Sequence, residues 1–402
     1  MTVDFPKGFL WGAATSAHQV EGNNHNDWSE WEKSEARIKA LRVQGLDTQE
    51  YISGQACDHY NRFRDDFDIA KSLGHNAHRF SIEWSRIEPE EGKFDEKEIQ
   101  HYREVIKALR ERGMEPFVTL WHWTLPVWFM DKGGFEKRRN TIYFVRFCER
   151  MAKEFGKDVK FWITINEPTV YTGMSYYAGI FPPQRKSVLM FRRVLNNLAK
   201  AHCEVYDVIH DLQDHCWVGI AQSANYFEGW AASLMRWFWH RRFLNRIQNY
   251  QDFIGVNYYY RRLVRGFDFS AGGGPRSDRG WEIYPEGIFH VLKSLARYKK
   301  PIYITENGLA DAKDQYRSGF IVDHLCWIHK AIEEGVDVRG YFYWSLLDNF
   351  EWEEGFWPRF GLLEVDYKTQ ERRPRPSIGI YGQIAAANGI TEELIAKTGG
   401  QR

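Results

Sequence analysis

The chain has 402 residues, with 54 acidic and 54 basic side chains, so its formal net charge is zero. A surface that binds nucleic acid or an anionic membrane normally needs a basic excess, so this balance gives no support for either partner. No apolar run approaches the roughly 18 residues that a membrane-spanning helix requires. Hydrophobic residues at 43% and charged residues at 27% are ordinary for a soluble globular protein.

The N-terminus and the cysteines favour a reducing compartment. The segment Met1–Pro6 lacks the charged and apolar parts of a secretory leader. Five cysteines are scattered along the chain, with no CxxC pair and no Cys/His spacing typical of a metal site. No glycine motif that cradles phosphate is present. We therefore expect a cytoplasmic protein that uses no metal and no cofactor.

Short β-rich apolar runs alternate with stretches of helical periodicity along the whole chain. Three of these stretches, Asp58–Leu73, Glu96–Arg112 and Tyr316–Glu334, carry apolar residues along one helical face. We count eight β-rich runs, which in chain order are Phe9–Val20, His75–Trp84, Pro116–Trp123, Phe161–Glu167, Trp217–Ala224, Phe253–Tyr259, Ile302–Glu306 and Arg339–Leu347.

The alternation of strand and helix predicts the fold class. A single β-α series favours a parallel sheet with helices outside it. Eight repeats in a chain of this size favour a closed barrel over an open sheet. No linker rich in Pro, Ser or Gly divides the chain. We therefore predict an α/β protein with one catalytic domain, residues 1–402, folded as a single (β/α)8 TIM barrel.

Two glutamates stand at equivalent positions at strand ends, where barrels of this kind build their active sites. Glu167 lies in the segment Thr164–Pro168 (TINEP) and Glu306 in Ile304–Gly308 (ITENG). Strands four and seven lie across the barrel mouth, so the two carboxylates would face each other. A lone glutamate at a strand end is more often a salt bridge or a loop anchor. An opposed pair is what glycosidic cleavage needs, with one group protonating the leaving oxygen and one attacking the anomeric carbon.

Further motifs accompany these two segments in a fixed order. A single pentapeptide arises by chance, but the ordered set resembles glycoside hydrolase family 1, the β-glucosidase and β-galactosidase family, over essentially the whole chain. Besides TINEP and ITENG, the matching segments are Phe9–Gly22 (FLWGAATSAHQVEG), Arg79–Ile82 (RFSI), Trp121–Trp123 (WHW) with Leu125–Pro126, Trp344–Trp352 (WSLLDNFEW) and Arg359–Leu362 (RFGL).

The resemblance implies a role for each matching residue. Glu167 is then expected as the general acid/base, Glu306 as the nucleophile, and Asn166 as a donor to the sugar 2-hydroxyl. Arg79 and Asn257 are expected to support the nucleophile, because a cation and hydrogen-bond donors favour a charged carboxylate. The expected substrate-binding residues are Gln19, His122, Trp123, Asn166, Tyr259, Trp344, Glu351 and Trp352, with Tyr259 also orienting the nucleophile.

Glu351 also bears on the kind of substrate. In the family, 6-phospho-glycosidases place a serine near this position and follow it with lysine and tyrosine. Here the segment Glu351–Phe356 (EWEEGF) is acidic and would repel a phosphate dianion. The resemblance thus predicts a retaining, exo-acting enzyme for unphosphorylated small-molecule or oligosaccharide β-glycosides. We expect glucosides above all, with galactosides and fucosides as further candidates.

The chain is a shortened member by comparison with the family. The segment Phe227–Tyr250 has room for about one helix, and Tyr171–Ser187 is also trimmed. Because such loops build the aglycone side, where Trp281 and Phe360 are expected, acceptor preference does not carry over. The stretch Ile38–Gly54 shows no helical face and is interpreted as a cap over the site.

Three further interpretations stay open. The aromatic stretch Trp230–Phe243 is where we expect a contact if copies of the chain form a homo-oligomer. A sugar-binding protein on an inactive scaffold would have lost a catalytic carboxylate, yet Glu167 and Glu306 are both present. An enzyme that mainly transfers the glycosyl group to an acceptor has the same residues, and product analysis with added acceptor separates it from a hydrolase.

Overall fold

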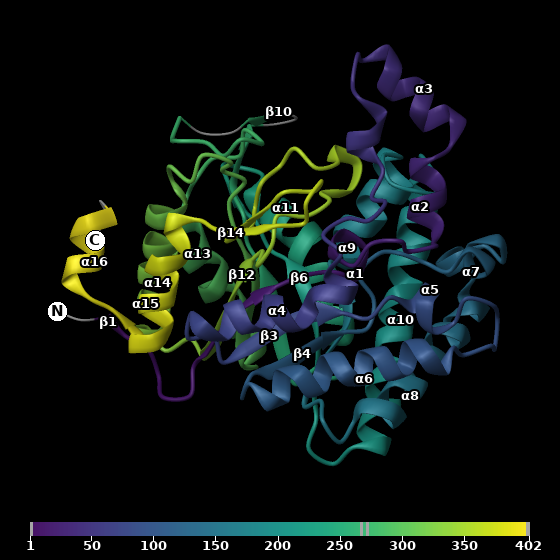
Figure 1. Cartoon of the computed structure of the whole chain (residues 1–402), viewed down its shortest axis with the longest axis horizontal. Coiled ribbons are helices and arrows are strands. Elements are labelled where there is room, and N and C mark those ends of the chain that lie inside the picture. Colours follow the sequence, from purple (N-terminus) through teal and green to yellow (C-terminus); the bar gives the residue numbers. More distant parts are fainter. Residues whose placement is uncertain (1–2, 266–267, 271–272, 399–402) are drawn as a thin grey trace.

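The computed structural model describes residues 3–265, 268–270 and 273–398. Eight parallel strands close into a barrel in the order β11-β12-β2-β3-β4-β5-β6-β8, with helices around it (Figure 1). Each of the eight predicted runs overlaps one barrel strand, so the predicted (β/α)8 barrel is confirmed. The strands are β2 (Leu10–Ala14), β3 (Ala77–Ser81), β4 (Glu115–Thr119), β5 (Phe161–Asn166), β6 (Trp217–Ser223), β8 (Phe253–Asn257), β11 (Ile302–Asn307) and β12 (Val338–Trp344).

Aromatic side chains fill the barrel interior. Phe117 and Phe161 stack with centroids 4.2 Å apart, and Phe117 also contacts Tyr303 at 5.1 Å and Phe342 at 4.7 Å. Gly12 lets β2 approach β3, because a Cβ there would lie 2.3 Å from the Ala77 carbonyl oxygen. The interior is therefore a packed core, and functional groups gather at the strand ends.

The helices around the barrel begin and end close to the predicted bounds. The three predicted stretches appear as α4 (His59–Ser72), α6 (Glu96–Glu111) and α14 (Arg317–Glu333), each within two residues of the expected ends. No helix among the described residues is long and apolar enough to cross a membrane. The other main helices are α8 (Thr141–Phe155), α10 (Val188–Leu212), α13 (Glu286–Leu295), α15 (Pro376–Ala387) and α16 (Glu392–Thr398).

The shorter elements connect and cover this frame. Two small antiparallel pairs and one three-stranded sheet lie outside the barrel. They comprise β1 (Val3–Asp4) with β15 (Gly389–Ile390), β13 (Leu363–Val365) with β14 (Arg372–Pro374), and β7 (Tyr226–Glu228), β9 (Arg261–Arg265) and β10 (Asp268–Ser270). The short helices include α2 (Asp27–Glu32), α5 (Trp84–Ile87), α7 (Val127–Asp131), α9 (Pro168–Thr172), η2 (Gly134–Glu136), η3 (Arg138–Asn140), η4 (Gly173–Ala178), η6 (Ala296–Tyr298) and η7 (Trp352–Glu354).

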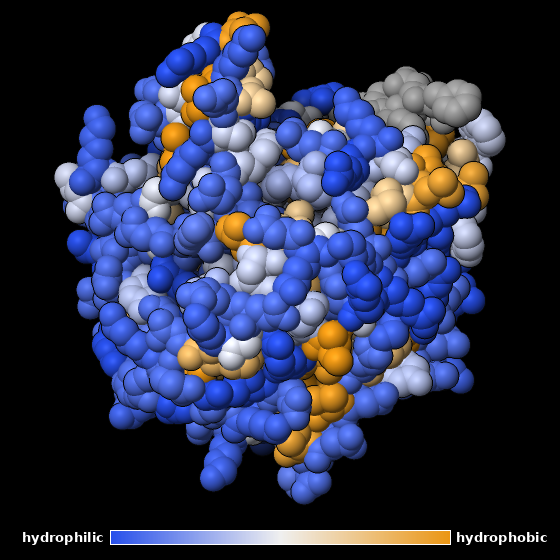
Figure 2. Space-filling view, turned by 90° about the vertical axis from the view of Figure 1, so that its right-hand side faces the viewer, coloured by the Kyte–Doolittle hydropathy of each residue, from blue (hydrophilic) through white to orange (hydrophobic). Residues whose placement is uncertain are grey.

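One sequence interpretation near the N-terminus was wrong in detail, and a helix in a second segment was not predicted. The first run continues past its strand into α1 (Ala17–Val20), whose residues are all buried and so give no periodic signal. The stretch without a helical face holds most of α3 (Glu35–Val43) and the 3₁₀ turn η1 (Thr48–Tyr51). Leu41 is the one buried residue of α3, which explains the missing apolar face. Helix α3 stands away from the barrel (Figure 1), and in Figure 2 hydrophobic patches lie on the projection at the top.

The trimmed segment between β6 and β8 is helical, as predicted. It runs through α11 (Ala232–Arg236), the π-helical turn η5 (Trp237–Arg241) and α12 (Arg242–Ile247). Trp230 and Leu234 are exposed, at 81% and 65%. The apolar surface expected here is therefore present, and its use as a contact between copies stays a prediction.

Candidate active site

The two strand-end glutamates lie on well-separated strands of the barrel. Glu167 directly follows β5 and Glu306 belongs to β11, with β6 and β8 between them in the barrel order. Both are buried, at 6% and 4% exposure. Glu167 has a left-handed backbone, with φ of 44°, at the start of α9. Non-glycine residues in this conformation cost energy and gather at functional sites.

The Glu306 carboxylate is held by two donors. Arg79 Nη1 lies 2.5 Å from Oε1, and the Tyr259 hydroxyl donates to Oε2 at 2.7 Å. Arg79 is 1% exposed and is itself fixed, since its guanidinium also donates to the Thr305 carbonyl at 3.1 Å and the Thr119 hydroxyl at 3.2 Å. A buried carboxylate paired in this way is favoured in its charged form.

Asn166 connects this ion pair to His122. Its Oδ1 accepts from Arg79 Nη2 at 2.6 Å and from Asn257 Nδ2 at 3.2 Å, so its Nδ2 is a donor toward His122 Nε2 at 3.1 Å. Burial, with a contribution from Arg79, holds the pKa of His122 well below its usual value, so the ring is neutral. Because Nε2 accepts, the proton lies on Nδ1. That buried Nδ1 has no hydrogen-bond partner among the described residues.

Glu167 has a different environment from Glu306. Burial, and next the negative charge of Glu306, raise the pKa of Glu167 to about 8. Hydrogen bonds from Asn257 and Ser223 and the charge of Arg79 act in the opposite direction without cancelling that rise. One carboxyl group is thus ion-paired and the other retains its proton near neutral pH, and such a separation marks acid and base roles in enzymes.

The polar side of the predicted sugar pocket is formed by Gln19 of α1 and by Glu351 in the loop after β12. Gln19 is fully buried, and its Nε2 donates to the Phe350 carbonyl at 2.8 Å, to Asn349 Oδ1 at 3.0 Å and to Glu351 Oε2 at 3.3 Å. Its Oε1 accepts from the Ser16 hydroxyl at 2.6 Å. Gln19 therefore already bonds protein groups on both sides of its amide and holds Glu351 in place.

Aromatic rings pack around these polar groups. Trp352 stacks against His122, with centroids 5.9 Å apart, and against His18 at 5.6 Å. Trp344 stacks on His122 at 5.9 Å, and Trp123 Nε1 donates to the Asn166 carbonyl at 3.0 Å. Trp123 and Trp352 share the left-handed backbone of Glu167, with φ of 80° and 53°.

The two residues expected on the aglycone side also lie here. Trp281 packs near Tyr259 at 5.5 Å and near Phe360 at 6.3 Å between centroids. Since Tyr259 also bonds Glu306, these rings lie beside the carboxylate pair. Chains of contacts, which reach Gln19 and Glu351 through Arg279, link all fourteen predicted site residues, namely Gln19, Arg79, His122, Trp123, Asn166, Glu167, Asn257, Tyr259, Trp281, Glu306, Trp344, Glu351, Trp352 and Phe360.

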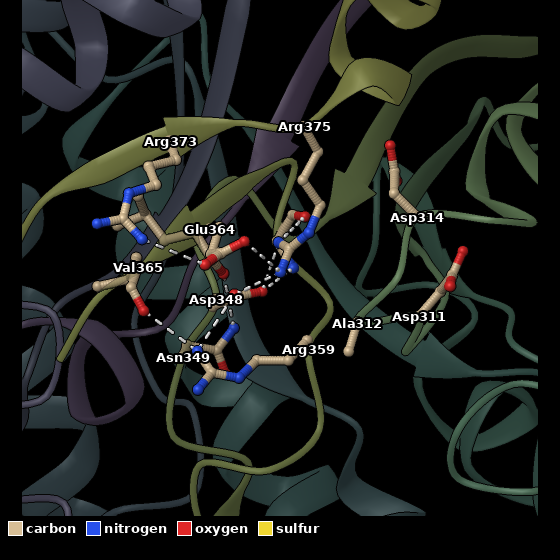
Figure 3. A network of polar contacts seen from close by, with 12 residues as sticks. Asp311, Ala312, Asp314, Asp348, Asn349, Arg359, Glu364, Val365, Arg373 and Arg375 are labelled. Carbon is tan, nitrogen blue, oxygen red and sulfur yellow. Dashed lines mark hydrogen bonds and ion pairs between the residues drawn. The ribbon is translucent and has the colours of Figure 1, made fainter.

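The sequence analysis assigned no role to the ion pair that anchors the loop after β12 (Figure 3). Asp348 is fully buried and accepts both guanidinium nitrogens of Arg375, each at 2.9 Å, and the Gly361 amide at 2.8 Å. Arg359 adds a longer contact at 3.4 Å. The Asp348–Arg375 ion pair thus joins the two ends of the loop that carries Glu351 and Phe360. Arg375 follows the last motif of the sequence analysis.

Arg279 was also missed. It lies two residues before Trp281 and ion-pairs with Glu351 and Glu354. The one signal in the sequence is its place two residues before an expected site tryptophan. No group of three or more His, Cys, Asp or Glu placed to hold a metal ion occurs in the described part of the chain.

A (β/α)8 barrel with two buried carboxyl groups in unequal environments at its strand ends is the arrangement of a glycoside hydrolase. Comparison with known families agrees, because the model of glycosyl hydrolase family 1 matches residues 1–234 and 240–390. The chain belongs to this family and is a glycoside hydrolase that acts on O-glycosyl bonds.

Related proteins of known structure or activity are similar over nearly their whole length. The structure of a β-glycosidase from Pyrococcus horikoshii has a TM-score of 0.90 and 42% identity, covering 100% of this chain and 99% of that one. β-Glucosidase A of Thermotoga maritima is 35% identical, over 96% of this chain and 99% of its own. A β-galactosidase of Sulfolobus acidocaldarius is 33% identical, over 98% and 97%. The alignment with the Thermotoga enzyme spans 451 positions, so that relative has segments that this shorter chain lacks.

Proposed function

We propose that the protein is a retaining, exo-acting β-glycosidase that cleaves unphosphorylated β-glycosides by double displacement. The observation that carries the proposal is the unequal state of the two carboxyl groups. Glu306 lies against Arg79 at 2.5 Å, while the pKa of Glu167 is raised to about 8. A charged nucleophile and a protonated acid at neutral pH are the two groups that the first step requires.

In the first step Glu306 attacks the anomeric carbon, and the bond from that carbon to the leaving oxygen breaks. Glu167 gives its proton to this oxygen as it departs. The product is a glycosyl ester on Glu306, which has lost its negative charge. Because that charge is the second-largest cause of the raised pKa of Glu167, the pKa falls once the ester forms.

In the second step Glu167 acts as a base. The ionised carboxylate takes a proton from water, whose oxygen attacks the anomeric carbon and displaces Glu306. Both residues return to their starting states, with Glu167 protonated and Glu306 charged. Arg79 and Tyr259 receive the carboxylate again, so the nucleophile leaves the sugar as a stabilised anion.

The pocket favours a neutral sugar. We place the unpartnered N–H of His122 and the acceptor oxygens of Glu351 against hydroxyl groups of the sugar. Glu353 and Glu354 lie near Glu351 and oppose a second anion such as a sugar phosphate. The named relatives act on β-glucosides or β-galactosides. We propose β-glucosides as the main substrates, with β-galactosides and β-fucosides as alternatives.

The test is release of nitrophenol from a panel of nitrophenyl β-glycosides by the parent protein, Glu306→Gln and Glu167→Ala. We expect turnover by the parent and almost none by Glu306→Gln. Azide should restore Glu167→Ala and give a β-glycosyl azide, since a small anion attacks the ester without a base. Glu371→Gln, a change at an exposed glutamate, is the matched control. A folded parent that turns over no sugar contradicts the proposal.

Transfer to an acceptor is a second outcome of the same chemistry, since an alcohol can replace water in the second step. Trp281 and Phe360 lie beside Tyr259 and offer aromatic surface where an acceptor would bind. Product analysis with and without added alcohol measures the balance between transfer and hydrolysis.

A further inference from the structure

One cation lies beside Glu351 and is absent from the mechanism above. Arg279 belongs to the loop before α13, and its side chain is 14% exposed. Its Nη1 donates to Glu351 Oε1 at 3.1 Å, and its Nε lies 2.6 Å from Glu354 Oε2. Its guanidinium carbon also lies 4.0 Å from the centroid of the Trp281 ring. The residue thus joins the loop after β12 to the loop that carries Trp281.

The turn that presents Arg279 is well defined. The Ser277 amide donates to the Trp281 carbonyl at 2.9 Å, and the Gly280 amide to the Ser277 carbonyl at 2.8 Å. Asp278 fixes the turn to the barrel side by accepting the Ala312 amide at 2.7 Å. Gly280 has φ of 75°, which a residue with a side chain rarely adopts. Arg279 therefore points at Glu351 from a fixed support.

The Glu351 carboxylate is shared between two partners. Arg279 binds Oε1, while Gln19 donates to Oε2 at 3.3 Å from the opposite side. Together the two donors set the plane of the carboxylate and leave its remaining lone pairs for a ligand. Gln19 has further partners in Asn349 and Phe350, so its position does not depend on Glu351.

The charges around this group make the cation necessary. Glu353, Glu354 and Glu306 all act on Glu351 as like charges, and Arg37 faces Glu353 from α3. Arg279 is the basic group whose charge counts most in favour of ionised Glu351. Even with Arg279 in place, burial and these acidic neighbours raise the pKa of Glu351 to about 8. Without Arg279 the pKa would rise further and favour the protonated form, which has one acceptor atom fewer.

We infer that Arg279 is a positioning residue for sugar recognition, which clamps Glu351 from the Trp281 loop and thereby sets the preference among sugars. The inference rests on the proposed function, because Glu351 must contact the glycone. The groups that bond Glu351, Arg279 and Gln19, are different from those that bond Glu306, so we place Glu351 against hydroxyls remote from the anomeric carbon. Discrimination at C4 and C6 should therefore depend on Arg279.

The experiment compares Arg279→Met and Arg279→Lys with the parent on nitrophenyl β-glucoside and β-xyloside, which differ by the C6 hydroxymethyl group. We expect Arg279→Met to lower the glucoside-to-xyloside ratio of kcat/KM about tenfold, mainly through a higher KM for the glucoside. Arg279→Lys keeps the charge without the planar fork and should recover part of the ratio. Arg339→Met removes an exposed pair at the start of β12 and should leave it unchanged.

The inhibition constant of phenyl 1-thio-β-glucoside, a neutral ligand, gives a second readout that depends on binding alone. It should rise about tenfold in Arg279→Met, in step with KM. A parent that neither turns over a glycoside nor binds the thioglucoside refutes the proposed function itself. An active parent whose sugar ratio and inhibition constant are matched by Arg279→Met, within twofold, overturns the inference about Arg279.

Discussion

The base and the rim of the pocket are built in different ways. At the base, the groups around Glu306 stand on barrel strands: Arg79 on β3, Asn166 on β5 and Asn257 on β8. At the rim, Glu351 and Arg279 stand on loops and hold each other. Strand ends are placed by the closed hydrogen-bonded barrel, whereas loop residues depend on a few side-chain contacts. We therefore expect the chemistry to reside in the base and sugar preference in the rim.

The largest effect should follow from substituting Arg79, which lies at the base of the pocket. Arg79→Met removes the cation beside Glu306 and two hydrogen bonds that fix Asn166 and the Thr305 carbonyl. We expect kcat to fall by about 10²–10³-fold, the scale of losing one preorganised electrostatic contact. Leaving a buried carboxylate unpaired should also lower the free energy of unfolding by about 3–5 kcal/mol.

Initial rates and urea denaturation measure these two effects. Arg79→Lys retains a charge without the planar fork and should fall between the parent and the methionine variant. A folded Arg79→Met protein with the kcat of the parent would show that Glu306 does not depend on this ion pair.

The next largest effect should follow from substituting Asp348, which anchors the loop that carries Glu351. Asp348→Asn leaves Arg375, only 5% exposed, without its bidentate partner. We expect a loss of about 3 kcal/mol in the free energy of unfolding, as for other broken buried pairs. Asp337→Asn, in a half-exposed pair with Arg339, should change it by less than about 0.5 kcal/mol.

Urea titration of both variants makes this comparison. Equal losses of unfolding free energy in Asp348→Asn and Asp337→Asn would mean that the buried ion pair does not stabilise the loop. Activity of the folded Asp348→Asn protein should fall less than that of Arg79→Met, because Asp348 acts on the loop and does not contact Glu306.

These buried pairs also show what the sequence could and could not predict. The eight strands and the two glutamates follow from periodicity and position, because a closed barrel forces strand ends to one face. Asp348 was visible as a strand-end carboxylate, but its partner Arg375 is set by tertiary packing after the last motif. Arg279 depends on a loop turn and an acidic neighbour 72 residues away, which local patterns do not encode. Helix α3 was missed because nearly all of its side chains face solvent.

The pH dependence should report the state of Glu167. The pKa of Glu167 is raised to about 8, and the protonated form is the acid of the first step. As pH rises through about 8 this form is lost, so kcat/KM should fall about tenfold per pH unit above that point. In Glu306→Gln the like charge is gone, and ¹³C NMR of Glu167 should show a lower pKa than in the parent. An alkaline limb that stays flat to pH 10 would rule out Glu167 as the acid.

The smallest effect should come from the rim at Trp281. Trp281→Ala removes a ring beside Tyr259 and should raise KM for nitrophenyl glycosides about fivefold, in keeping with the energy of one aromatic contact. A glycosyl fluoride has no aromatic leaving group, so its KM should not change. An equal rise for both substrates would assign Trp281 to the sugar side of the pocket.

Covalent trapping tests the central proposal most directly. The parent protein is incubated with dinitrophenyl 2-deoxy-2-fluoro-β-glucoside, whose fluorine slows both steps while its dinitrophenolate leaving group keeps formation of the ester fast. We predict one fluoroglucosyl group per chain by mass spectrometry, attached to Glu306, with a matching loss of activity. A label on another residue, or an unlabelled protein that still turns over the fluorosugar, would contradict a double displacement through Glu306.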